Sequence, residues 1–286
     1  MFAEPPRTRF DLHFRLAGFP VRVSPWFWLT AVLLGLAGQR GNQSDPALVL
    51  IFVVTVFFSI LIHELGHALA IRRFGHGSRI ILYQLGGLAT IDAEDSYLPS
   101  YQQHQTTPRS MILIALAGPA AGFVFAALLV VLFLLSPIIF RFTFDNPGPG
   151  IGWQMQGLPF RVQALIGDLL FINIFWGLVN LLPVYPLDGG QIARELMSTR
   201  SPRDGIERSL KLSAITGGVV AALAVFHFFR LKDYSSGLFI GLMFGMLAFS
   251  SYRALQMIRA HGGFGEYGGG YGGRGHEADD DDWWKR

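Results

Sequence analysis

The sequence predicts an all-α polytopic membrane protein, with about six transmembrane helices and a small membrane-associated β-hairpin. Of its 286 residues, 51% are hydrophobic and only 15% are charged, and the mean hydropathy is +0.39. A soluble domain usually has about 25% charged residues. Several apolar runs also reach the ~20 residues that a helix needs to cross a bilayer. The chain contains no cysteine, which excludes disulfides and thiolate metal ligands.

Six segments are long and apolar enough to be predicted as spans. They are residues 23–39, 47–73, 110–140, 159–182, 209–230 and 236–258. If the N-terminus is cytoplasmic, most of the 23 basic residues fall on the cytoplasmic side. Because cytoplasmic loops are enriched in Lys and Arg, we expect both termini to be cytoplasmic, in a multi-pass protein of the plasma membrane. The same charges are therefore explained by topology and do not indicate nucleic-acid binding.

The chain divides into three predicted regions. Residues 1–22 form a cytoplasmic arm, 23–260 the six-span core, and 261–286 a disordered cytoplasmic tail. The tail is rich in glycine and then in aspartate, so it cannot bury enough apolar surface to fold. Within the core, residues 78–92 alternate loosely around a Gly-Gly pair, which is typical of a β-hairpin.

Two histidines and a glutamate interrupt the second predicted span in the sequence HELGH. His63 and His67 are one helical turn apart on the same face, and Glu64 lies within the same arc. At this spacing two histidines can hold Zn²⁺ while the glutamate handles the protons of a metal-bound water. The alternative is a polar cluster packed between helices. Burying these groups at membrane depth without a task is costly, which favours the metal site.

A zinc site with an open position needs a third protein ligand. The candidate is Asp188, the only acid in the segment NLLPVYPLDGG at 180–190. Pro183 and Pro186 cannot continue a regular helix, and broken backbone at membrane depth occurs where protein or a water-filled cavity surrounds it. Such a place suits a carboxylate directed at a metal. Alternatively, Asp188 is the N-cap of a helix that begins near Gly189, and both roles can hold together.

HELGH in a span and the later N-x-x-P-x-x-P-L-D-G-G element resemble the site-2 protease family of intramembrane zinc metalloproteases. The resemblance covers roughly residues 10–258 and is closest to the minimal branch, without PDZ or nucleotide-binding modules. It implies an endopeptidase with one Zn²⁺ per chain that cuts transmembrane segments of membrane proteins. It also implies site roles by position: His63, His67 and Asp188 as zinc ligands, Glu64 as catalytic acid/base, and Asn180 as a contact to the substrate or the oxyanion.

Other parts of the chain match the family less specifically. GGLATI resembles the hairpin that receives the substrate, so Gly86 and Gly87 are expected at a strand that pairs with the unwound segment. The alternative is a purely structural loop. AGPAAG at 117–122 resembles the small-residue packing motif of the third span. Asn173 lies seven residues before Asn180 on the same helical face, and we expect it to line the cavity.

Two other functions could use the same polar cluster. A zinc transporter would use it as a translocation site, but transporters usually supply polar residues from several spans, often with internal repeats. A catalytically silent relative would bind transmembrane helices without cutting them, and would be expected to lose Glu64 or a ligand. The protease function is favoured, with a transmembrane protein substrate and the lipid bilayer as partners and no nucleic acid.

Overall fold

The computed structural model describes residues 6–37, 45–84, 86–92, 107–135, 139–143, 152–201, 204–231 and 236–260. The helices are α1 (Pro25–Ala37), α2 (Pro46–Arg73), α3 (Pro108–Leu134), α4 (Phe160–Phe171), the π-helical η1 (Ile172–Trp176), α5 (Gly177–Asn180), α6 (Asp188–Arg200), α7 (Gly205–Leu231) and α8 (Ser236–Ala260). The strands are β1 (Leu12–Leu16), β2 (Phe19–Val23), β3 (Gly77–Tyr83), β4 (Gly86–Asp92), β5 (Ile139–Thr143) and β6 (Gly152–Gln156). The predicted tail 261–286 lies outside the described residues.

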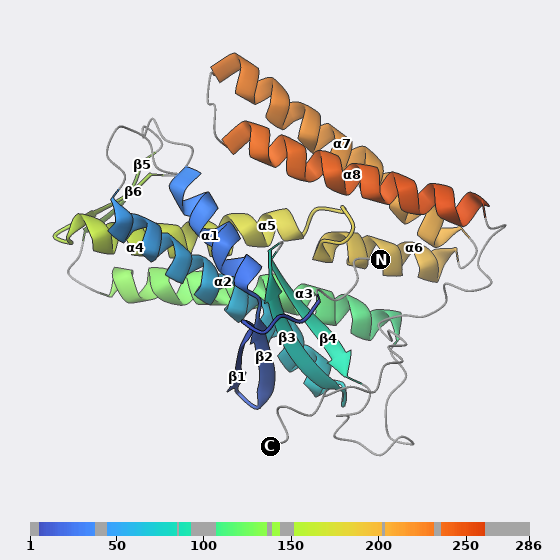
Figure 1. The fold of residues 1–286 in the computed structure, drawn as a ribbon, viewed down its shortest axis with the longest axis horizontal. Coiled ribbons are helices and arrows are strands. Elements are labelled where there is room, and N and C mark those ends of the chain that lie inside the picture. The colour runs from blue at the N-terminus through green and yellow to red at the C-terminus, as the bar shows by residue number, and fades with distance from the viewer. Residues whose placement is uncertain are drawn as a thin grey trace.

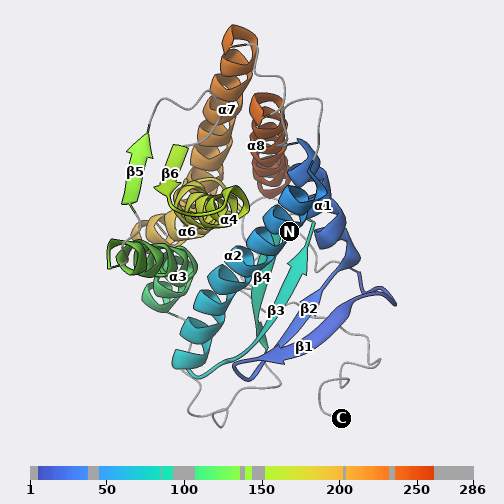
Figure 2. The same cartoon turned by 90° about the vertical axis from the view of Figure 1, so that its left-hand side faces the viewer.

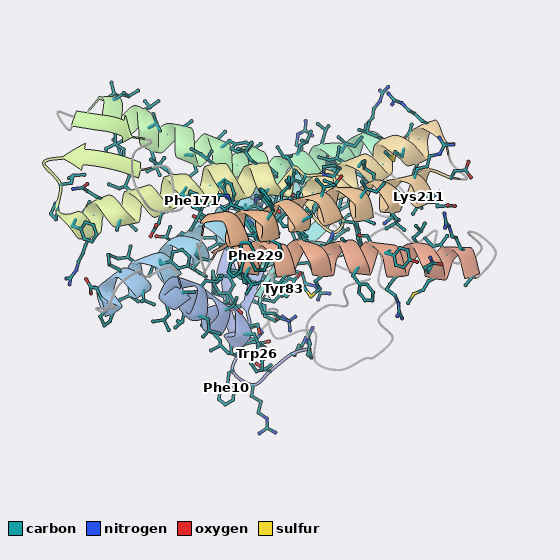
Figure 3. The ribbon with its side chains drawn as sticks, turned by 90° about the horizontal axis from the view of Figure 1, so that it is seen from above. Phe10, Trp26, Tyr83, Phe171, Lys211 and Phe229 are labelled. Carbon is teal, nitrogen blue, oxygen red and sulfur yellow. The ribbon has the colours of Figure 1, made fainter. Side chains whose placement is uncertain are left out.

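Within the described residues, five helical segments are long and apolar enough to cross a membrane. They are α2, α3, the continuous run from α4 to α5, α7 and α8. The predicted span 23–39 contains α1, whose 13 residues reach only about 20 Å at the α-helical rise, less than the ~30 Å hydrocarbon core. Many large apolar side chains on the outer faces are exposed, including Phe10, Trp26 and Phe229 (Figure 3), as expected where lipid replaces water.

Helix α2 is the centre of the arrangement. It runs between the four-stranded sheet on one side and α3 and α4 on the other (Figure 2), and it contacts α1 as well. The helix begins where the Asp45 side chain accepts a hydrogen bond from the Ala47 amide, with Pro46 in the first turn. It ends at Arg73, with Phe74 as the C-cap residue and Gly75, with a positive φ of 85°, after it. Because α2 packs against the sheet, α1, α3 and α4, the polar groups on its buried face are surrounded by protein.

The predicted hairpin at 78–92 is present as β3 and β4, but it belongs to a larger sheet. The strand order is β1-β2-β3-β4, with β2 and β3 parallel and the other pairs antiparallel (Figure 1). Residues 12–23, predicted to be part of an arm and the start of a span, form the β1–β2 hairpin. Its turn is held to α2 by Arg72, whose Nη1 donates to the Ala17 carbonyl at 2.9 Å. Strand β4 is an edge of this sheet.

Candidate active site

The buried face of α2 carries the HELGH residues side by side. His63, Glu64 and His67 are all less than a tenth exposed. The Nδ1–H of His67 donates to the carbonyl oxygen of Ile114 in α3 at 2.7 Å. Because a carbonyl only accepts, the hydrogen sits on Nδ1, so the lone pair of the neutral ring is on Nε2. This tautomer is the one that a metal ligand requires.

The third predicted ligand joins them from α6. Asp188 Oδ2 lies 3.1 Å from Nε2 of His63, and Oδ1 lies 3.3 Å from Nε2 of His67. Asp188 is the first residue of α6, but the cap position is Leu187 and no side chain caps this helix. The capping role considered for Asp188 is therefore wrong. Its carboxylate instead faces the two imidazoles.

The distances within this cluster fit a tetrahedral zinc ion. Bond lengths of about 2.0–2.1 Å place two tetrahedral ligand atoms roughly 3.3 Å apart. The two Nε2 atoms are 3.1 Å apart, each lies 3.1 or 3.3 Å from a different oxygen of the Asp188 carboxylate, and one ligand atom from each residue lies within 4.8 Å of the others. The Oδ2 atom of Asp188 is buried and receives no hydrogen bond. Two imidazole nitrogens and a buried carboxylate that converge at these distances are ligand atoms that a cation can hold together.

Glu64 is set between the metal ligands and the edge of the sheet. The backbone amide of Ala89 in β4 interacts with its carboxylate, and the side chains of His63, His67 and Asp188 lie close enough to interact with it electrostatically. A Cβ atom added at Gly87 would fall within 2.5 Å of Cδ of Glu64. Only glycine therefore allows β4 to approach the carboxylate this closely.

The AGPAAG motif has a similar relation to His67. A Cβ atom at Gly118 would overlap the His67 imidazole ring, so α3 meets α2 without an intervening side chain. The Ile114 carbonyl that orients His67 lies one turn earlier on α3. The small residues of this motif thus bring a backbone acceptor to a metal ligand. No residue pattern could predict that acceptor, because a backbone carbonyl has no side-chain identity.

The two predicted asparagines, Asn173 and Asn180, differ in their hydrogen bonds. The Asn173 amide donates to Ser59 Oγ at 2.9 Å and to the Leu169 carbonyl at 2.8 Å, so both hydrogens are used within the helices. The buried Asn180 side chain, at the end of α5, makes no hydrogen bond to the described residues. Gly86 has a positive φ of 129° and open space around it. Of these residues, Asn180 has donors free for a ligand.

Comparison with known proteins gives consistent matches. A model of the family described as peptidase family M50 matches residues 51–155 and 155–225. A candidate zinc metalloprotease of Synechocystis is 31% identical over 64% of this chain and 42% of its own length. A zinc metalloprotease of Methanocaldococcus jannaschii is 26% identical over 73% of this chain and 51% of its own length. The chain thus spans about half the length of these curated relatives.

Among solved structures, the site-2 protease from Methanocaldococcus jannaschii is similar with a TM-score of 0.49 and 21% identity. The match covers 85% of this chain and 94% of that chain.

Proposed function

Because the chain belongs to peptidase family M50, the site-2 protease family, we propose that it is a zinc-dependent endopeptidase that hydrolyses peptide bonds within transmembrane segments of membrane proteins. One observation carries the proposal: the zinc-compatible cluster of His63, His67 and Asp188 has Glu64 beside it, within a helix of membrane-spanning length. A cleavage site at that depth is reached by a substrate in the bilayer.

The chain's own groups suit hydrolysis of a peptide bond. Bound zinc would lower the pKa of a water molecule to about 7 and polarise the carbonyl to be cut. Glu64 would accept a proton from the attacking water and pass it to the leaving amine. The free amide hydrogens of Asn180 would donate to the developing oxyanion. The tight packing of Gly87 and Gly118 would keep Glu64 and His67 in place during these steps.

Strand β4 is suited to hold the substrate. A residue in an antiparallel strand directs its N–H and C=O to the same side, and the Ala89 amide turns toward Glu64. Gly87 and Ile91, two residues away on each side, share this orientation, so their backbone groups face the site. A transmembrane helix must unwind before it can be cut, and pairing with this edge would replace its lost hydrogen bonds. The β3–β4 hairpin then has a role beyond structure.

The depth of the site predicts where a substrate is cut. Ten residues separate His63 from Arg73 at the end of α2, which is about 15 Å along the helix. Arg72 and Arg73 in the last turn of α2 favour a cytoplasmic position for this end, and water would then reach the zinc from that side. Cleavage would fall in the cytoplasmic half of the substrate segment and release a fragment inward. That outcome corresponds to regulated intramembrane proteolysis at the plasma membrane.

A Glu64→Gln variant tests the function. It keeps the shape of the side chain but removes the basic carboxylate, so it should retain zinc and stop cutting a transmembrane reporter peptide. Glu195→Gln, on α6 outside the cluster, is the control and should cut at the wild-type rate. Cleavage by Glu64→Gln at the wild-type rate would refute the role of Glu64. Zinc flux in proteoliposomes without peptide cleavage by the wild type would instead indicate a transporter.

A further inference from the structure

The loop between α5 and α6 delivers Asp188, and its backbone is held by two serines of the last helix pair. We propose that Ser213 in α7 and Ser251 in α8, the serine pair, are positioning residues that fix this loop through Tyr185 and thereby aim the Asp188 carboxylate. This inference rests on the proposed function, because it assumes that Asp188 binds a metal. The hydrogen bonds of the serine pair do not depend on that assumption.

The hydrogen bonds form a closed ring with one consistent direction. The Tyr185 amide donates to Ser213 Oγ at 2.7 Å, and Ser251 Oγ donates to the Tyr185 carbonyl at 3.5 Å. The two hydroxyls are 2.8 Å apart. Because the hydrogen of Ser251 is used on the carbonyl, Ser213 donates to Ser251. Every donor in the ring then has an acceptor, and both polar groups of Tyr185 are satisfied.

Neighbouring serines on the same helices behave differently. Ser209 Oγ donates to the Ile206 carbonyl and Ser250 Oγ donates to the Leu247 carbonyl, which are bonds within one helix. Such local bonds are the usual use of a serine in an apolar helix. The serine pair instead bridges two helices and a loop, and each member is only 1% exposed.

The Tyr185 backbone is also confined from the other side. A Cβ atom at Gly190 would lie 2.5 Å from the Tyr185 nitrogen, so the first turn of α6 packs directly on this residue. Val184 is fully buried against Phe244 and Leu247 of α8. A loop held between the α6 backbone and two buried hydroxyls has little room to shift, and Asp188 follows only three residues later.

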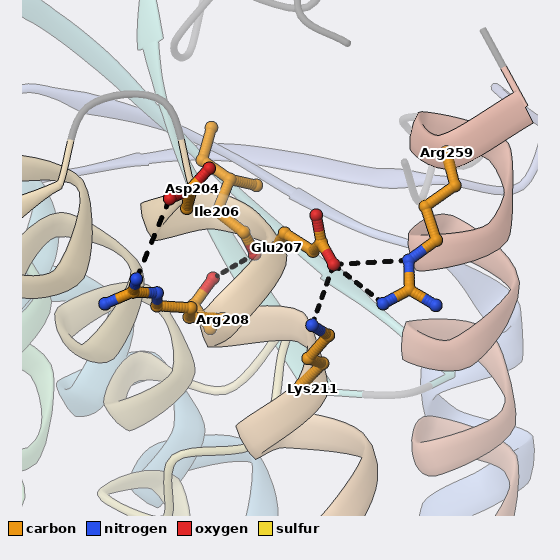
Figure 4. Close-up of polar contacts among 7 residues, drawn as sticks. Asp204, Ile206, Glu207, Arg208, Lys211 and Arg259 are labelled. Atoms are coloured by element: carbon orange, nitrogen blue, oxygen red, sulfur yellow. Dashed lines mark hydrogen bonds and ion pairs between the residues drawn. The ribbon is translucent and has the colours of Figure 1, made fainter. Parts of the chain in front are cut away.

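The α7–α8 pair is joined at its end as well. Glu207 of α7 accepts from Arg259 of α8 at 2.7 Å and pairs with Lys211 at 2.8 Å (Figure 4). This contact is partly exposed and contributes little by itself. With the serine pair, it joins the two helices at two levels, so a movement of the pair would be passed to Tyr185 and the metal ligand.

Three variants test the serine pair: Ser213→Ala, Ser251→Ala and the double change. Substituting a residue that orients a metal ligand typically lowers metal affinity by roughly 10–100-fold. Each single variant should therefore weaken Zn²⁺ binding about tenfold. The double variant should be little worse than either single one, because both belong to one network. Ser209→Ala and Ser250→Ala are the matched controls and should stay within about twofold of wild type.

Two further measurements distinguish a shift of the Asp188 carboxylate from destabilisation of the whole protein. The visible absorption of the Co²⁺-loaded protein reports ligand geometry and should change in the serine variants but not in the controls. In metal-free protein, hydrogen exchange at the Tyr185 amide should be roughly tenfold faster in Ser213→Ala than in wild type. Exchange at the amides of α7 and α8 should stay unchanged. Should Ser213→Ala not fold, Ser251→Ala keeps the bond to the Tyr185 amide and supplies the milder break.

The outcomes distinguish this inference from the proposed function. If the wild type binds zinc and cuts, while the serine variants match the controls in affinity, spectrum and exchange, only the serine-pair inference is overturned. If wild-type protein binds no zinc, both fail.

Discussion

Replacing Gly87 with alanine should disable Glu64 without removing the metal. The new Cβ would lie 2.5 Å from Cδ of Glu64, whereas ordinary contact begins at 3.4 Å. The carboxyl group must therefore retreat by roughly 1 Å, and a misplacement of about 1 Å can cost on the order of 10²-fold in rate. We expect kcat to fall about 100-fold and the zinc content to stay unchanged, since the three atoms nearest to this Cβ all belong to Glu64.

The assay is steady-state cleavage of a transmembrane reporter peptide in proteoliposomes, with zinc measured on the same preparation. Gly218→Ala is a suitable control, because a Cβ there meets nothing within 4 Å. A kcat for Gly87→Ala close to that of Gly218→Ala would refute the close approach of β4 to Glu64. Loss of zinc from Gly87→Ala would show that the strand supports the ligands rather than the catalytic carboxylate.

Three other predictions address the metal and the cut. Gly118→Ala should push the His67 ring aside and weaken Zn²⁺ binding by roughly 10–100-fold in a chelator competition, and unchanged affinity would contradict the packing of α3. Metal analysis should find zinc reduced in Asp188→Ala and more severely in His63→Ala, while full occupancy in the His63→Ala, His67→Ala double variant would refute the ligand set. Mass spectrometry should place cuts in the cytoplasmic half of the substrate, faster near Gly, Asn or Pro; cuts confined to the outer half would refute the depth of the site.

The side chains of the metal cluster could be predicted from the sequence because local patterns of residue type and spacing identify them. Helical periodicity alone places His63 and His67 on one face. Asp188 could be nominated as the only acid of a proline-broken segment, although its meeting with the histidines depends on packing that no local pattern encodes. The structure brings these three together.

Other parts of the site and fold depend on backbone atoms and long-range contacts. The Ile114 carbonyl and the Ala89 amide carry no residue-type signal, so neither could be predicted. The β1–β2 hairpin did have one, because LHFRL and FPVRV are separated by only two residues. Its arginines and short length made it resemble a charged arm. Asn173 shares a helical face with Asn180, but periodicity cannot tell a cavity from a helix contact such as that with Ser59.

The two halves of the metal cluster are far apart in the chain, and this affects how the protein is made. The ribosome completes α2, with His63 and His67, long before Asp188 is synthesised. During insertion, α2 offers two ligands where a zinc site needs three from the protein. Metal capture is therefore a late event that follows the docking of α6. A newly made chain therefore passes through the insertion machinery before its metal cluster is complete.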